Sequence, residues 1–255
     1  MSGSLPASSS PASDPGSGAA RRAAKPSRAG TEVWSRSEAT RSAAGEPAGS
    51  SGAAPREPIA LFGSSADPPT HGHRALLQGL LRYYPQVATW ASDNPLKQHT
   101  APLPLRMALL QALVEAIGDP RLQLVQELSS PWTVETLERA RQLWPGREPV
   151  IVIGADLAAQ VPRWRQAAQW LQGCRVAIVP RAGWTLQPHS LEQLRQRGAR
   201  LELLDLVVPA SASSGVRQRP DPQLVPQELW PVLRGHDPYG LLTPRCASPS
   251  PSSTP

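Results

Sequence analysis

A segment near residue 60 combines small residues, prolines and histidines in an order that suits phosphate binding. Residues 63–73 read GSSADPPTHGH and follow the apolar run PIALF at 58–62. An apolar run that ends at a glycine is typical of a buried strand entering a turn. Backbone N–H groups and the positive end of a helix dipole would then converge where the next helix begins, and such a place binds phosphate. The candidate phosphate-binding residues of this segment are Gly63, Ser64, Ser65, Thr70 and His73.

A second candidate for phosphate binding lies late in the chain. Residues 212–217 read ASSGVR and follow the apolar run 201–206. Hydroxyl groups and the amides of a helix N-terminus bind phosphate oxygens, and a guanidinium can hold two such oxygens at once. Ser213, Ser214 and Arg217 are therefore of the residue types that can bind phosphate.

Strand and helix patterns alternate between these two segments. Strand-like apolar runs occur at 58–62, 87–91, 122–125, 149–153, 175–179 and 201–206, and helical spacing occurs at 73–84, 105–117, 134–143, 165–171 and 190–197. This alternation predicts an α/β fold, a Rossmann-like parallel sheet with helices on both faces. Ligands of such sheets bind beyond the carboxyl ends of the strands, where the strand order reverses. The residues that follow 62, 91 and 153 are therefore the ones expected to meet a ligand.

Composition predicts one folded domain with a tail at each end. The chain has 255 residues, and its 30 prolines and 19 glycines lie mainly toward the ends. Such stretches bury too little apolar surface to offset the entropy of ordering them. We therefore expect disordered segments at 1–57 and 243–255, and a single domain at 58–242. Residues 1–57 resemble an organelle transit peptide in their Ser, Ala and Arg content, but their five acidic residues favour a disordered extension or a start codon placed too early.

Charge, cysteine usage and hydropathy exclude several classes of protein. The formal charge is +6, but no basic run is longer than Arg21-Arg22, so we expect an anionic small substrate and no nucleic acid. Cys174 and Cys246 form neither a disulfide framework nor a metal-ligand spacing, and no structural metal is expected. No apolar stretch approaches the roughly 18 residues of a membrane span, and no secretory signal is visible. We expect a cytoplasmic protein without membrane contact, and its oligomeric state stays open.

Two short motifs resemble a known superfamily. Thr70-His71-Gly72-His73 resembles the (H/T)xGH signature of the α/β nucleotidyltransferases, and residues 212–217 resemble the Ser/Thr-rich second half of that signature, which ends in Arg. Residues 64–66 read SSA where many members have Gly, Thr and Phe. Small residues still allow ATP phosphates to approach the backbone, so this departure is expected to be tolerated.

Within this superfamily the chain resembles the nicotinate-nucleotide adenylyltransferase family from Ile59 to about Leu241. Several short segments carry this resemblance. No one of them is decisive, but the order and spacing of the segments together are hard to obtain by chance. The segments that carry the resemblance, besides Trp164, are Asn94–Lys97, Leu105–Met107, Trp132–Leu137, Ile153–Asp156 and Leu224–Pro226.

The resemblance implies transfer of AMP from ATP to nicotinate mononucleotide, with Mg²⁺ bound mainly through the ATP phosphates. By that resemblance His73 touches the α-phosphate under attack, Ser214 and Arg217 hold the leaving pyrophosphate, and Lys97 lies over the phosphates. Gly154 and Asp156 hold the sugars of the two nucleotides. Trp164 stacks on the pyridine ring and Thr133 lies near its carboxylate, with Trp132 beside them where the family usually has Tyr.

Other interpretations of the same residues stay open. Trp132 and Trp164 could be packing residues, because aromatic side chains usually serve cores. Asp156 could cap a helix, Lys97 could be a solvated loop residue, and Arg106 is expected to serve the fold through a salt bridge or helix face. Another nucleotidyltransferase, using nicotinamide mononucleotide, phosphopantetheine or a cytidylyl donor, is one alternative function. A non-catalytic nucleotide-binding protein is the other.

Overall fold

The computed structural model describes residues 56–95, 97–180, 185–206, 208–209 and 211–242. The segments expected to be disordered, 1–57 and 243–255, lie outside these ranges except for Arg56 and Glu57. The carbonyl of Glu57 accepts a hydrogen bond from the backbone N–H of Glu148 at 2.9 Å, so the described structure begins just before the expected domain boundary. Within the described ranges, no helix is long and apolar enough to cross a membrane.

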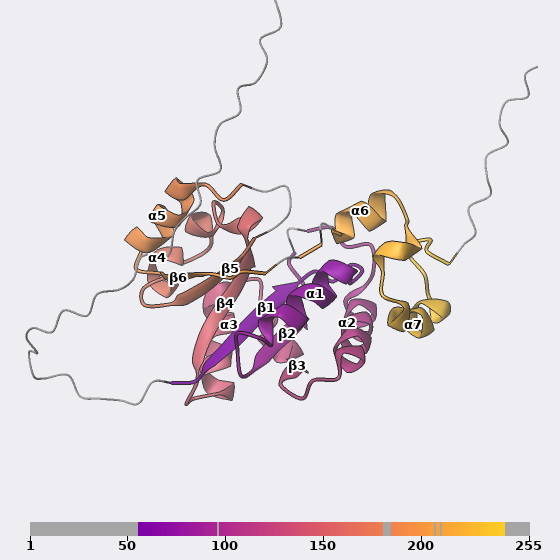
Figure 1. The fold of residues 1–255 in the computed structure, drawn as a ribbon, viewed down its shortest axis with the longest axis horizontal. Helices are drawn as coiled ribbons and strands as arrows, with labels where there is room; N and C mark the ends of the chain where they lie inside the picture. The colour runs from indigo at the N-terminus through magenta and orange to yellow at the C-terminus, as the bar shows by residue number, and fades with distance from the viewer. Residues whose placement is uncertain (1–55, 96, 181–184, 207, 210, 243–255) are drawn as a thin grey trace, which may run out of the picture. The chain divides into compact units, whose positions relative to one another are not determined.

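Six parallel strands form one sheet in the order β3-β2-β1-β4-β5-β6. Helices flank the strands (Figure 1). The predicted α/β fold with a parallel sheet is therefore confirmed. The strands are β1 Pro58–Ser64, β2 Val87–Ala91, β3 Leu122–Leu124, β4 Glu148–Gly154, β5 Arg175–Val179 and β6 Arg200–Leu203; the helices are α1 His71–Leu80, α2 Leu103–Ile117, α3 Thr133–Leu143, α4 Ala167–Trp170, α5 Pro188–Gln196, α6 Ser213–Gln218 and α7 Trp230–Gly235.

Alternation along β4 shows how the sheet is buried on both faces. Val150 and Val152 belong to one hydrophobic cluster, with residues of α1, α2 and α7. Ile151 and Ile153 belong to the other cluster, with residues of α3, α4 and α5. Successive side chains of a strand point to opposite faces, so a strand that is apolar throughout requires a cover on both sides.

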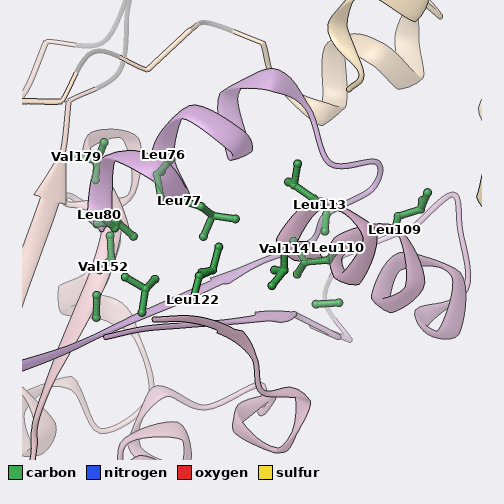
Figure 2. Close-up of a cluster of buried hydrophobic side chains, with 14 of the residues drawn as sticks. Leu76, Leu77, Leu80, Leu109, Leu110, Leu113, Val114, Leu122, Val152 and Val179 are labelled. Carbon is green, nitrogen blue, oxygen red and sulfur yellow. The ribbon is translucent and has the colours of Figure 1, made fainter. Parts of the chain in front are cut away.

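The first cluster holds the helix that carries the phosphate-binding candidates. Leu76, Leu77 and Leu80 of α1 are buried with Leu110 and other residues of α2, and Figure 2 shows the leucines of the two helices gathered over the sheet. Burying a leucine side chain stabilises the fold by about 1.5–3 kcal/mol. The N-terminus of α1 is thereby fixed at the carboxyl end of β1.

Several elements end earlier than their patterns predict. α1 stops at Leu80, and the next residues form tighter turn bonds, from Arg82 N to the carbonyl of Gly79 and from Tyr83 N to that of Leu80. Such bonds satisfy the last carbonyls of a helix without continuing it. α4 is a single turn, and β6 ends at Leu203 although the apolar pattern extends to Leu206.

Candidate active site

A cavity of about 480 Å³ lies where the strand order reverses, between β1 and β4. Its wall contains small residues after β1, the first turn of α1, the loop after β2, the turn after β4 and the start of α6. The structure therefore brings the two candidate phosphate-binding segments to one place. The predicted site residues that line the cavity are Gly63, Ser64, Ser65, His73, Lys97, Gly154, Asp156, Ser213, Ser214 and Arg217.

Thr70 orients His73 from the position before α1. The backbone N–H of Thr70 donates to Nδ1 of His73 at 3.1 Å. A backbone amide can only donate, so Nδ1 carries no proton and a neutral His73 has its proton on Nε2. Thr70 itself is fully buried and its hydroxyl donates to the carbonyl of Ser211 at 2.8 Å. Thr70 therefore acts from behind the cavity wall, while His73 presents a hydrogen-bond donor in the first turn of a helix.

Gly72 allows a distant segment to approach α1. Its N–H donates to the hydroxyl of Ser211 at 2.8 Å. A Cβ atom at this position would lie 2.9 Å from the carbonyl oxygen of Ser211 and 3.1 Å from that of Pro209. The glycine between the two histidines is thus required by close backbone contact across the site.

Gly63 has a simpler explanation in packing. A Cβ atom there would lie 2.5 Å from ring atoms of Trp90 on the neighbouring strand. The absence of a side chain also leaves the backbone at the end of β1 open to the cavity, which Gly63 lines.

The helix α6 is tied directly to the turn after β1. The Ser213 hydroxyl donates to the carbonyl of Pro68 at 2.8 Å, and Nη1 of Arg217 donates to the carbonyl of Asp67 at 2.7 Å. The same Nη1 atom lies 3.8 Å from the Asp67 carboxylate. These contacts hold the Arg217 guanidinium at the cavity wall.

The loops after β2 and β4 supply the other charges of the cavity. Lys97 is exposed. Its N–H closes a turn by donating to the carbonyl of Asn94 at 3.0 Å. Asp156 lies in a short 3₁₀ turn, Ala155–Leu157, directly after Gly154. Lys97 and Arg217 face a cavity to which Asp156 contributes the one carboxylate among the described lining residues. The excess of positive over negative charge among these three side chains favours an anionic ligand.

The three residues expected to bind the acceptor's ring do not line this cavity. Thr133 is the first residue of α3, and Trp132 precedes it. Trp164 packs beside Trp170, with ring centroids 6.3 Å apart. The two segments nevertheless meet, because the guanidinium of Arg165 lies 4.7 Å from the centre of the Trp132 ring. Their placement leaves the expected acceptor role a prediction.

Arg106 serves the fold, in agreement with the sequence. It is almost fully buried, and its guanidinium donates to the carbonyls of Ala101, Ser65 and Ser92. It also pairs with Asp93 at 2.7 Å. A single side chain of α2 thereby ties the loop after β1 to the loop after β2.

Sequence reasoning missed Asp67, which organises the turn after β1. Its buried carboxylate accepts hydrogen bonds from the N–H groups of Thr100 and Ala101 and from the hydroxyl of Tyr239. Burial, and then the hydrogen bond to this carboxylate, raise the pKa of Tyr239 far above its ordinary value. The Asp-Pro dipeptide signalled only a turn, and nothing in the sequence pairs it with residues 100 and 239. His99 and Ser211, which also line the cavity, were missed for the same reason.

The described residues fit a metal ion that is held mainly by its nucleotide. They contain no group of three or more His, Cys, Asp or Glu side chains able to hold a metal. Asp156 is the one carboxylate among the described residues that line the cavity. Magnesium retains much of its water and binds commonly through substrate phosphates.

The fold and the cavity define an α/β nucleotidyltransferase, and comparisons with known proteins specify it further. Residues 61–219 match the cytidylyltransferase-like family model. A Synechocystis sp. protein named as a probable nicotinate-nucleotide adenylyltransferase is 36% identical over 197 residues, which cover 71% of this chain and 98% of that protein. A Hahella chejuensis protein of the same name is 28% identical over 215 residues, 72% of this chain and 97% of its own length.

Solved structures agree on the fold. Nicotinic acid mononucleotide adenylyltransferase of Plasmodium falciparum, complexed with NaAD, superimposes with a TM-score of 0.60 at 14% identity, covering 72% of this chain and 98% of that one. The same protein complexed with APC gives a TM-score of 0.58 at 15% identity, covering the same shares. The chain belongs to the nicotinate-nucleotide adenylyltransferase group of the cytidylyltransferase-like family.

Proposed function

We propose that this protein transfers AMP from ATP to nicotinate mononucleotide, releasing pyrophosphate and forming nicotinate adenine dinucleotide, a step of NAD biosynthesis. The observation that carries the proposal is the convergence of His73, Lys97 and Arg217 on one cavity at the switch point of the sheet. The family membership and the names of the relatives support the choice of nucleotides.

The reaction needs no general base in this site. An oxygen of the acceptor's phosphate attacks the α-phosphorus of ATP, and the bond from that phosphorus to the oxygen bridging the β-phosphate breaks. The pyrophosphate leaves with the bonding electrons. A phosphate monoester is already charged at neutral pH, so its oxygen is a nucleophile without losing a proton. This chemistry agrees with a cavity rich in cations and donors.

Catalysis then depends on alignment and on charge neutralisation. The proton on Nε2 makes His73 a donor to an oxygen of the α-phosphate, where negative charge rearranges during transfer. Arg217 and Ser214 bind the phosphates that leave, and Lys97 covers them from the loop after β2. When bound through ATP oxygens and water, magnesium neutralises further charge on the phosphates.

The acceptor is assigned to the segment at the start of α3. Thr133 and neighbouring backbone N–H groups bind the carboxylate of the pyridine ring, and Trp164 stacks on the ring. The position of Thr133 as the first residue of α3 supports this assignment, because the N-terminus of a helix favours an anion. Gly154 and Asp156 hold ribose hydroxyls between the two subsites.

Pyrophosphate release by the full chain tests the proposal. The protein is incubated with ATP and Mg²⁺ and, in turn, with nicotinate mononucleotide, nicotinamide mononucleotide and phosphopantetheine, and with CTP in place of ATP. Nicotinate mononucleotide with ATP is expected to give the fastest release, and mass spectrometry should identify the dinucleotide. A preference for another pair would replace the proposal, and release with no pair would indicate a binding protein.

A matched pair of arginine variants locates the reaction. Arg217→Gln should raise the KM for ATP by roughly tenfold or more, because it removes a charged contact to the phosphates. Arg234→Gln changes an exposed arginine on α7, which does not line the cavity, and should leave the kinetics unchanged. Equal effects of the two changes would contradict the placement of the phosphates.

A further inference from the structure

His99 lines the same cavity but has no part in the function described above. It lies in the loop after β2, two residues beyond Lys97, and its side chain is 12% exposed. A histidine so deeply placed in a polar wall is normally held by hydrogen bonds from both ring nitrogens.

The ring of His99 is incompletely bonded. Its Nδ1 atom lies 3.8 Å from Oδ2 of Asp67, which is beyond hydrogen-bond distance. Its Nε2 atom is buried and has no hydrogen-bond partner among the described residues. A buried nitrogen without a partner is unfavourable, so a ligand that supplies one is bound more tightly.

Asp67 biases the position of the proton on the neutral ring of His99. Its carboxylate already accepts three hydrogen bonds, from Thr100, Ala101 and Tyr239, which is the pattern of an acceptor-only group. Nδ1 is the ring nitrogen near this carboxylate, so the negative charge of Asp67 favours the neutral tautomer with its proton on Nδ1. Nε2 of the neutral ring is then a lone pair, which cannot bind a phosphate oxygen.

The surroundings keep His99 neutral before a ligand binds. Burial, and secondarily the charge of Arg106, lower the pKa of His99 below its usual value, although Asp67 opposes the shift. A phosphate placed against the ring would act in the opposite direction, because an imidazolium between two anions is stabilised. The charged groups that face His99 from the elements packed around it are Asp67, Asp93, Lys97, Arg106 and, through Asp67, Arg217.

We propose that His99 is a further nucleotide-binding residue: its ring, whose Nε2 atom is buried in this structure, turns toward the cavity that it lines and takes up one proton as Nε2 donates to a phosphate oxygen of the bound nucleotide. The inference rests on the proposed function, because it requires a nucleotide in this cavity. The phosphate can belong to ATP or to the acceptor, and the two sources share the chemistry that His99 recognises.

Calorimetry of the full chain in buffers of different ionisation enthalpy measures the proton directly. MgATP and nicotinate mononucleotide are titrated separately at pH 7.5 into wild type, His99→Gln and His99→Leu. The glutamine amide can donate near the position of Nε2 but cannot take up a proton, whereas leucine does neither. His189→Gln, an exposed histidine on α5, is the matched control.

Wild type is expected to take up more protons than His99→Gln with at least one of the two nucleotides, which also identifies the source of the phosphate. His99→Leu should bind that nucleotide roughly tenfold more weakly, with His99→Gln in between. Wild-type affinity should fall as the pH rises from 6 to 8, more steeply than that of His99→Gln. Because the two proteins differ only at residue 99 and receive the same nucleotide, the difference in proton uptake belongs to His99.

The outcomes separate this inference from the function on which it rests. Equal proton uptake and equal affinity in wild type, His99→Gln and His189→Gln would overturn the role of His99, while leaving nucleotide binding intact. A lower melting temperature of the His99 variants with unchanged proton uptake would also overturn it, since that is the behaviour of a structural residue. Failure of wild type to bind either nucleotide would overturn the proposed function and this inference together.

Discussion

The hydroxyl of Tyr239 donates to Oδ1 of Asp67 at 2.8 Å, across 172 residues of the chain. Tyr239 and Asp67 are 4% and 1% exposed. The same aspartate lies at the turn that carries the candidate phosphate site, and its carbonyl holds Arg217. Residues near the C-terminal end of the domain therefore stabilise the turn after β1, which forms part of the cavity wall.

Tyr239→Phe should reduce the free energy of unfolding by about 1–3 kcal/mol, because it leaves a buried carboxylate with one donor fewer at nearly constant volume. Urea denaturation measures the change. Tyr83→Phe is the matched control, since its hydroxyl donates to the carbonyl of Asp205 at an exposed position. An equal decrease in the free energy of unfolding in the two variants would show that the hydrogen bond to Asp67 stabilises the fold no more than the exposed hydrogen bond of Tyr83.

His73→Ala should lower kcat by roughly a hundredfold or more while the protein stays folded, because it removes a donor to charge that rearranges in the transition state. Steady-state pyrophosphate release measures kcat, and circular dichroism checks the fold. His71→Ala changes the other histidine of the same helical turn, which does not line the cavity, and should cost far less. A fully active His73→Ala protein would remove the central element of the mechanism.

The protein should prefer nicotinate mononucleotide over nicotinamide mononucleotide by roughly a hundredfold or more in kcat/KM. An amide set against hydrogen-bond donors brings its own NH₂ group toward them and leaves them unpaired, at about 1–3 kcal/mol for each group. Ring stacking on Trp164 cannot distinguish the two acceptors. Equal use of both would refute the nicotinate assignment.

Thr133→Val tests which donor makes that distinction. The change keeps the shape of the side chain and removes its hydroxyl, so the preference should decrease if the hydroxyl binds the carboxylate. The measurement is kcat/KM for both acceptors. An unchanged preference would show that the Thr133 hydroxyl does not distinguish the two acceptors. The backbone N–H groups at the start of α3 would then be the discriminating donors.

Cys174 should resist alkylation in the folded protein. Burial raises the pKa of its thiol to about 11, and the thiolate is the reactive form. Peptide mapping after iodoacetamide treatment at pH 8 should find Cys174 labelled slowly in native protein and rapidly in urea. A raised pKa favours the folded state at low pH, so this contribution to stability is lost as the pH rises from about 9 toward 11. Rapid native labelling would contradict the burial.

The local pattern of residues determined most of the secondary structure. β2 has the bounds that its apolar run predicts, and β4 exceeds its run by one residue at each end. A strand or helix repeats the same hydrogen bond along a short stretch, so periodicity is visible in the sequence. The ends were less predictable: α1 stops at Leu80, although its apolar spacing continues to Tyr84.

The candidate site also has residues that the sequence alone identifies and contacts that only the tertiary structure reveals. The segment 70–73 and the late segment 213–217 could be found from their residue types, because phosphate binding requires small residues, hydroxyls and a guanidinium close together in sequence. The contacts of Gly72 with Ser211 and of Asp67 with Tyr239 could not be found in that way. Each joins segments more than 130 residues apart, and only the path of the chain around the sheet decides which side chains share a buried space. His99 differs from an ordinary loop histidine for that reason alone: its sequence neighbours suggest a solvated residue, and its spatial neighbours enclose it.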